Sequence, residues 1–154
     1  MLETLYINKD YFHDIEICRK KTRSKNEFVP VYGNIKCGVP NEPETDLEGY
    51  IEIPKSMIGQ GDFFILRAKG DSMIEAGIHD GDLLFVRYQS FAEDGDIVVA
   101  YIDGEVTLKR LFKLEEEKAF LLHPENKDYQ DIKVKNCRII GIAEKIIKPI
   151  KEEN

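Results

Sequence analysis

Three Asp-Gly signals divide the second half of the chain into short apolar runs. They lie at Asp80-Gly81-Asp82, Asp94-Gly95-Asp96 and Asp103-Gly104, each directly before a β-prone run. Asp-Gly between two such runs is a strong hairpin signal, because both central residues of a type I′ turn need a positive φ. The sequence therefore predicts a β-hairpin over residues 97–112, which a helical fold could not accommodate.

Other apolar runs follow the same plan, and turn residues recur about every 8 to 12 positions, as in small β domains. A helical turn or two is expected only near Met73–Ala76. We therefore expect a compact, mostly β fold with short helical turns. Beyond the hairpin, strands are predicted at Tyr50–Ile53, Phe63–Ala68, Leu83–Val86, Ala119–Leu122 and Arg138–Ile147.

The first third of the chain gives weaker signals. Residues 9–21 have a loose apolar pattern that would fit one short amphipathic helix. Residues 38–46 contain Gly, Pro, Asn and Asp, and predict an exposed connector with little regular structure. We expect an N-terminal arm or linker over 1–28, a tether over 29–48, a folded domain over 49–150 and a frayed tail over 151–154.

Charge is unevenly distributed. The chain has 22 Lys and Arg against 29 Asp and Glu, a net charge of −7. An acidic balance argues against general adhesion to nucleic acid, which needs clustered cations. Residues 19–25, however, hold five cations and no acid. This run fits a solvated linker, or alternatively an arm that touches DNA or another acidic partner.

Several classes of protein are excluded. No apolar run approaches the roughly 18 to 20 residues that span a bilayer, and no signal peptide begins the chain, so we expect a cytoplasmic protein without membrane attachment. The three cysteines form no CxxC pair and should be free thiols. The histidines are isolated, and no nucleotide-binding glycine motif occurs, so neither a metal nor a cofactor is expected.

One segment has the pattern of a nucleophile. Ser72 lies in Lys69-Gly70-Asp71-Ser72-Met73, directly after the predicted strand FFILRA. A serine on a tight turn at a strand end can expose its hydroxyl, while N–H groups of the turn face a developing oxyanion. The alternative is an ordinary turn serine, because a nucleophile also needs a base.

The candidate base is Lys109, in the predicted hairpin. Strand alternation puts it on the same face as Thr107, opposite Val106 and Leu108. A lysine with an ordinary pKa near 10.4 is neutral in only about one molecule in 2,500 at pH 7. Burial disfavours the ammonium form and lowers the pKa. A Ser72–Lys109 pair therefore requires a desolvated Lys109, and the alternative is a solvated hairpin lysine.

Four runs in order carry a family resemblance: GDSMIEAGIHDGDLLFV, GDIVVAYIDGEVTLKRL, HPENKDYQDI and IIGIAEKII. Together they resemble the LexA-type self-cleaving serine peptidase domain, which also occurs in phage repressors and UmuD-like proteins. The resemblance covers about residues 29–148. It implies a fold like that of LexA and signal peptidases, although the latter are membrane-anchored.

The resemblance implies roles for particular residues. Ser72 would be the nucleophile and Lys109 the general base, with the Thr107 hydroxyl orienting the amine. The oxyanion would be held by backbone N–H groups at the turn of Asp71, Ser72 and Met73. Residues 49–150 would then be the Ser-Lys peptidase domain, with no cofactor and no metal.

The same resemblance implies that the substrate is the chain itself. Cys37-Gly38 lies in VYGNIKCGVP, within the tether, and fits a small residue followed by Gly. Tethering raises the effective concentration of the bond, Gly38 lets the backbone bend, and Ile35 could anchor the loop in an apolar hollow. In the family a RecA–DNA filament favours the docked loop, and docking would bury Lys109 further.

Two branches of the family remain open: a LexA-like repressor and a UmuD-like partner of a translesion DNA polymerase. Residues 1–28 are too short for a helix-turn-helix domain of roughly 60 residues, so direct DNA binding is not expected without a separate reader domain. The family also implies a homodimer, with Arg138–Ile147 as the candidate contact. The alternative function is a non-cleaving module for dimerisation and partner binding in a transcriptional regulator.

Overall fold

Strands account for most of the chain in the computed structural model, which describes residues 2–7, 12–13, 25–39 and 42–150. Within these ranges eleven strands form one hydrogen-bonded sheet, and the helical segments η2 (Lys55–Met57) and η3 (Ile74–Ala76) are 3₁₀ turns. The mostly β fold with short helical turns is therefore confirmed. The strands are β1 Glu3–Ile7, β2 Phe12–His13, β3 Asn26–Val39, β4 Glu42–Pro54, β5 Phe63–Arg67, β6 Leu83–Tyr88, β7 Ile97–Ile102, β8 Glu105–Leu114, β9 Ala119–His123, β10 Ile132–Val134 and β11 Arg138–Pro149.

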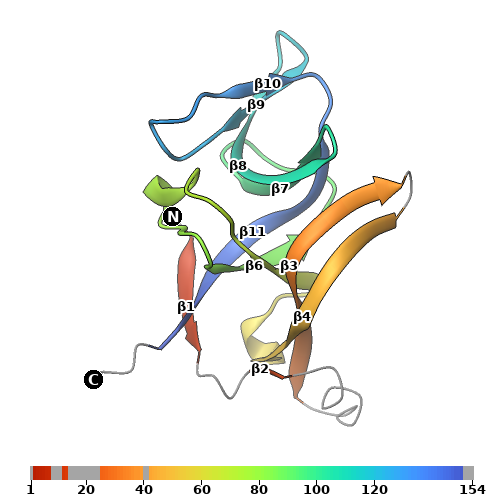
Figure 1. Ribbon diagram of the computed structural model, residues 1–154, viewed down its shortest axis with the longest axis vertical. Helices are drawn as coiled ribbons and strands as arrows, with labels where there is room; N and C mark the ends of the chain where they lie inside the picture. The colour runs from red at the N-terminus through yellow and green to blue at the C-terminus, as the bar shows by residue number, and fades with distance from the viewer. Residues whose placement is uncertain (1, 8–11, 14–24, 40–41, 151–154) are drawn as a thin grey trace.

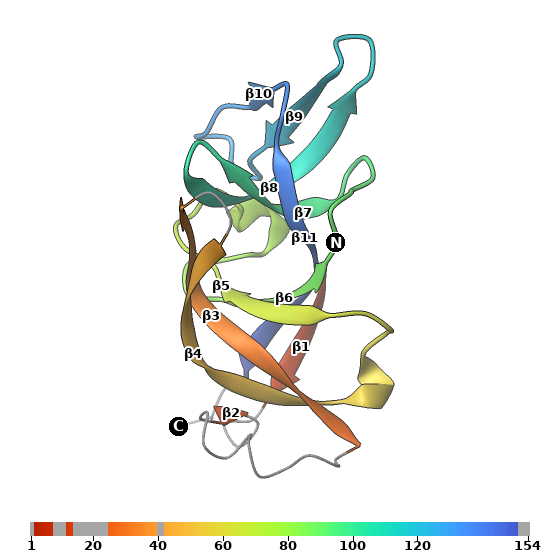
Figure 2. The ribbon, with the colours of Figure 1, turned by 90° about the vertical axis from the view of Figure 1, so that its right-hand side faces the viewer.

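Strand β11 connects the two ends of the sheet. The strand order is β10-β9-β8-β7-β11-β6-β5-β3-β4-β2, and β1 pairs in parallel with β11. Figures 1 and 2 show β7 to β10 at one end of the molecule and β2 to β4 at the other, with β11 running between them. Gly141 lies where β11 crosses β6, and a Cβ there would come within 2.5 Å of the Arg87 carbonyl oxygen. The close crossing thus requires glycine.

The hairpin predicted over residues 97–112 is confirmed. β7 and β8 pair in antiparallel register from Ile97 opposite Arg110 to Ile102 opposite Glu105. The two turn residues have the positive φ that a type I′ turn requires, 49° at Asp103 and 87° at Gly104. This register determines the position of Lys109 on β8, opposite Val98.

The main hydrophobic cluster packs directly beneath the segment that follows β5. It joins Phe64 and Leu84 of the sheet to Met73 and Ile78, which are 3% and 2% exposed. Met73 and Ile78 come from the stretch on either side of η3, so burial of these two side chains attaches the irregular backbone to the sheet. Ser72 therefore directly precedes a side chain that is anchored in the core.

Two expectations for the first third of the chain are wrong. Residues 38–46 were expected to be irregular, yet β3 and β4 continue through them, with Cys37 opposite Pro43 and Val39 opposite Glu42; residues 40–41 lie outside the described part. The turn-forming residues are tolerated because the two strands pair only with each other there. Of the helix expected over 9–21, the structure describes only Phe12–His13, and these two residues form a strand that pairs with β4.

The remainder of 9–21 lies outside the described residues, as do most of the basic run 19–25 and the tail 151–154. Cys137 is a free cysteine, as expected, whereas Cys18 and the side chain of Cys37 are not described. None of the helical segments in the described ranges has the length and hydropathy to span a bilayer.

Candidate active site

The end of β5 is clamped by backbone hydrogen bonds, and this positions Ser72. The Ala68 N–H donates to the Asp82 carbonyl oxygen at 2.7 Å, and the Gly81 N–H donates to that of Ala68 at 2.9 Å. The chain then turns at Gly70, whose φ is 78°, a value that favours glycine. The Gly70 N–H donates to the Asp80 carboxylate at 2.8 Å. Ser72 follows on a turn anchored at both ends.

Lys109 reaches Ser72 from the opposite side, on strand β8. Its Nζ lies 3.3 Å from Ser72 Oγ, 2.7 Å from Thr107 Oγ1 and 3.0 Å from the Leu108 carbonyl oxygen. The residue is only 8% exposed. It is therefore not the solvated hairpin lysine that the strand pattern also allowed, and the structure brings Ser72, Thr107 and Lys109 together.

The surroundings of Lys109 favour a neutral amine. Burial lowers the pKa of Lys109 below its ordinary value of 10.5. All three acceptors of its hydrogen bonds are uncharged oxygens, and no carboxylate in the described part of the chain forms an ion pair with it. No opposing charge in the described residues offsets the cost of burying the ammonium group, so the geometry suits a base more than a structural cation.

A cavity of about 120 Å³ lies beside Ser72. Its wall combines Thr107 and Leu108 of β8, the end of β5 and the turn after it, and Gly33 and Asn34 of β3. Strand β3 is the one that continues to Cys37. The cavity is therefore lined both by Ser72, the candidate nucleophile, and by β3, the strand that leads to the Cys37-Gly38 bond.

The Ser72 turn offers unused N–H donors. Among the residues that the structure describes, the backbone N–H groups of Ser72 and Met73 have no hydrogen-bond acceptor, whereas the neighbouring N–H groups of Gly70 and Ile74 do. Two adjacent donors beside a serine hydroxyl are the arrangement that can receive an oxyanion. The peptide carbonyl of Asp71 belongs to the same turn. The exposed carboxylate of Asp71 accepts a hydrogen bond from the Tyr129 hydroxyl.

The Cys37-Gly38 bond lies on the β3–β4 hairpin, not on an irregular tether. Cys37 is three residues beyond Asn34, which is about 10 Å along an extended strand. Its backbone pairs with Pro43 of β4. Any chemistry at this bond therefore involves a strand that is already hydrogen-bonded to its neighbour.

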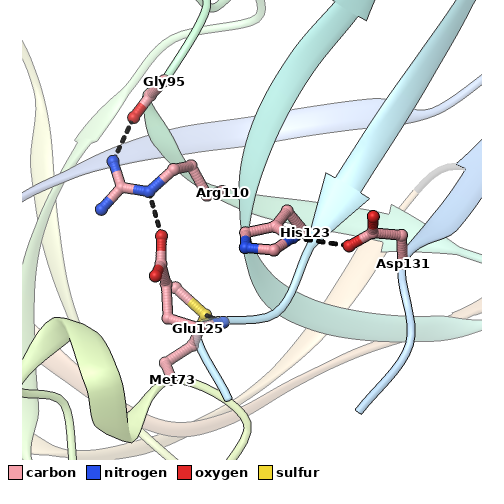
Figure 3. A network of polar contacts seen from close by, with 6 residues as sticks. All are labelled: Met73, Gly95, Arg110, His123, Glu125 and Asp131. Carbon is pink, nitrogen blue, oxygen red and sulfur yellow. Dashed lines mark hydrogen bonds and ion pairs between the residues drawn. The ribbon is translucent and has the colours of Figure 1, made fainter. Parts of the chain in front are cut away.

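The sequence assigned no site role to residues 123–131, among which Glu125 contacts the Ser72 turn. Figure 3 shows Glu125 between Arg110 of β8 and Met73: its carboxylate pairs with the guanidinium, and its N–H donates to Met73 Sδ at 3.4 Å. Arg110 also donates to the Gly95 carbonyl oxygen, and His123 pairs with Asp131. Glu125 lies in the motif HPENKDYQDI, but its contacts are with Arg110 and Met73, which are distant in the sequence.

No metal centre is indicated in the described ranges, where no three His, Cys, Asp or Glu side chains are grouped to hold an ion. The site as described consists of hydroxyl, amine and backbone groups. A hydroxyl group beside an amine is a combination that acyl-transfer chemistry can use.

Comparison with known proteins gives a consistent set of matches. The family model described as Peptidase S24-like matches residues 30–144. The LexA repressor of Syntrophomonas wolfei is 43% identical over 122 residues, covering 79% of this chain and 59% of that protein. The LexA repressor of Clostridium kluyveri is 44% identical over 128 residues, covering 82% and 62%. That of Geobacillus kaustophilus is 46% identical over 125 residues, covering 79% and 59%. The chain thus spans about 60% of the length of these curated relatives.

Proposed function

The chain belongs to the Peptidase S24-like family, and from this premise we propose that it cleaves its own backbone, with Ser72 as nucleophile and Lys109 as general base. The observation that carries the proposal is the 3.3 Å approach of a buried amine to the Ser72 hydroxyl. A solvated lysine or a distant one could not accept the serine proton at neutral pH.

The hydrogen bonds of Lys109 support the direction of proton transfer. A neutral amine has two N–H donors and one lone pair. If the donors remain on Thr107 Oγ1 and the Leu108 carbonyl oxygen, at 2.7 and 3.0 Å, the lone pair is directed at Ser72 Oγ. Thr107 would then orient the base rather than react.

The reaction would proceed by acyl transfer. Ser72 Oγ attacks the carbonyl carbon of Cys37 as its proton moves to Lys109, and the free N–H groups of Ser72 and Met73 stabilise the oxyanion. Lys109 then gives the proton to the nitrogen of Gly38, which leaves. Water, deprotonated by the same amine, hydrolyses the Ser72 ester and releases the first fragment.

The substrate would be the β3–β4 hairpin of the same chain. Its strand already lines the cavity at Gly33 and Asn34, and the bond lies three residues further along. Bending at Gly38 and opening of the pair between Cys37 and Pro43 would bring the carbonyl toward Ser72. Tethering supplies the high effective concentration that makes a deep recognition pocket unnecessary.

Regulation would act through the position of that hairpin. We propose a regulator of the DNA-damage or prophage type, either a LexA-like repressor or a UmuD-like polymerase partner, in which a RecA–DNA filament favours the docked hairpin. The LexA repressor relatives support the first branch. A homodimer with Arg138–Ile147 as its candidate contact belongs to the same proposal. Cytoplasmic location follows from these partners.

The test is incubation of the purified chain from neutral to alkaline pH, with mass spectrometry of the products. Cleavage yields fragments of 37 and 117 residues. Ser72→Ala and Lys109→Ala should abolish them, whereas Ser90→Ala and Lys113→Ala, which change an exposed serine and an exposed lysine of β8, should not. A chain that stays intact in every condition would indicate the non-cleaving binding module instead.

A further inference from the structure

We propose that Asn126 is a positioning residue for the Ser72 turn, fixing the peptide between Asp71 and Ser72 so that the Ser72 N–H is directed at the oxyanion. The inference rests on the proposed function, because the Ser72 N–H stabilises an oxyanion only if the site carries out acyl transfer. Asn126 lies in HPENKDYQDI, outside every role assigned so far.

Asn126 is buried in a way that demands a polar partner. It is 3% exposed, and it and Lys109 are the two buried polar or charged side chains among the described residues. Its Nδ2 donates to the Asp71 carbonyl oxygen at 2.8 Å, and its Oδ1 accepts from the Asp128 N–H at 2.9 Å. A buried amide left unpaired would cost about 1–3 kcal/mol. Both ends of this amide are therefore held in one orientation.

The bond to Asp71 fixes the next residue as well. The peptide unit is planar and trans, so the carbonyl oxygen of Asp71 and the N–H of Ser72 point in opposite directions from one rigid plane. Asn126 holds the oxygen from one side, and the N–H must face the other. The second donor to this oxygen, the Ile74 N–H, is more distant at 3.3 Å.

The same bond strengthens the donor. Hydrogen bonding to a carbonyl polarises its peptide and makes the N–H of that peptide a better donor, an effect that grows in a poorly solvated site. The Ser72 N–H has no acceptor in the described part of the chain. Asn126 thus orients the free Ser72 N–H and makes it a stronger hydrogen-bond donor before the substrate binds.

Neighbours of Asn126 hold the rest of the turn. The Glu125 N–H contacts Met73 Sδ at 3.4 Å, and the Glu125 carbonyl oxygen accepts the Glu75 N–H at 2.8 Å. These contacts flank Ser72 on its C-terminal side, whereas Asn126 acts on its N-terminal side. Tyr129 also reaches Asp71, but through the exposed side chain rather than the peptide, and so provides a matched control.

The test compares Asn126→Leu and Asn126→Asp with Tyr129→Phe. Leu preserves the shape of the side chain and removes the Nδ2 donor; Asp removes the donor and retains an oxygen for the Asp128 N–H. The readout is the plateau of the self-cleavage rate at high pH, where the charge state of Lys109 no longer matters. We expect both Asn126 variants to lower this plateau by about 10- to 100-fold, less than the loss of a whole oxyanion donor, and Tyr129→Phe to leave it within about twofold.

A second readout does not depend on cleavage. In a Lys109→Ala background, the amide ¹H and ¹⁵N resonances of Ser72 should move to lower frequency in both Asn126 variants, while the Gly70 amide, bonded to Asp80, serves as the reference for an intact turn. An unmoved Ser72 amide, or a plateau equal to that of Tyr129→Phe, would overturn the inference. If the unaltered chain does not cleave, the proposed function fails, and the Ser72 resonances still decide whether Asn126 orients the turn.

Discussion

The Nζ of Lys109 lies 3.3 Å from the Oγ of Ser72, although the two residues are 37 positions apart. Ser72 is held by the clamped end of β5, and Lys109 by the register of the β7–β8 hairpin. Thr107 and the Leu108 carbonyl accept the amine's other hydrogen bonds. In this account, the reactivity of the whole site depends on the protonation state of one buried amine.

The first prediction concerns the rate of self-cleavage as a function of pH. The neutral form of Lys109 is the reactive one, so the rate should rise tenfold per pH unit and level off at the pKa of Lys109. Burial lowers that pKa, which places the plateau below pH 10.5. The measurement is a pH–rate profile of fragment appearance. A profile that shows no rise with pH anywhere below pH 10.5 would contradict the role of the amine.

The second prediction concerns stability. The pKa of Lys109 is lower in the folded than in the unfolded chain, so between the folded value and 10.5 the unfolded state binds more protons and the free energy of unfolding rises with pH. At pH 7, well below 10.5, the folded protein is destabilised, either by the buried ammonium group or by the loss of its proton on folding. Lys109→Met should therefore raise the melting temperature at pH 7, and this gain should shrink as the pH approaches 10.5.

The chain with Lys109 and the Lys109→Met variant should both also carry Ser72→Ala, so that cleavage does not complicate the melting curves. Lys113→Met, at an exposed site on the same strand, is the control and should show no such pH dependence. A gain from Lys109→Met that is equal at pH 7 and pH 10 would show that packing, rather than charge, causes it.

The third prediction concerns Thr107. Thr107→Val keeps the shape of the side chain but removes the oxygen that accepts an N–H from Lys109 at 2.7 Å. One such hydrogen bond contributes about 1 kcal/mol, so the plateau rate should fall roughly fivefold. Thr107→Ser retains the hydroxyl and should stay close to the original rate. Equal rates for the Val and Ser variants would exclude an orienting role.

The fourth prediction concerns the hairpin that carries Lys109. Gly104 has a φ of 87°, and a Cβ there would meet nothing within 4 Å, so an added side chain acts only through backbone strain. Gly104→Ala should lower the free energy of unfolding by about 1–2 kcal/mol. Urea denaturation measures this. Glu105→Ala, one residue later in extended backbone, should change stability by less than about 0.5 kcal/mol.

The sequence predicted those parts of the fold whose signals are local. The Asp103-Gly104 pair alone predicts its turn, and the helical turn expected near Met73–Ala76 corresponds to η3. A second helical turn, η2, was not predicted, so the expectation of helical turns only near Met73–Ala76 is wrong. The strand pattern also gave the shared face of Thr107 and Lys109, which their hydrogen bond reflects.

Other features depend on contacts between distant residues. The Gly- and Pro-containing stretch around Cys37 gives a loop signal, yet it becomes strand because β4 is available to pair with it. Burial of Lys109 depends on the packing of other elements around β8, so periodicity left its exposure open. Asn126 meets Asp71 across 55 positions, a contact that no local pattern encodes.

The most direct test of the Ser72–Lys109 account is intact-mass analysis of the purified chain after incubation at pH 7 and at pH 10, with and without an activated RecA–DNA filament. The account predicts fragments of 37 and 117 residues, formed faster at pH 10 and at a rate independent of protein concentration, and an intact Ser72→Ala chain. An unaltered chain that stays whole under all four conditions, or a Ser72→Ala chain that is cut at the same bond, would contradict it.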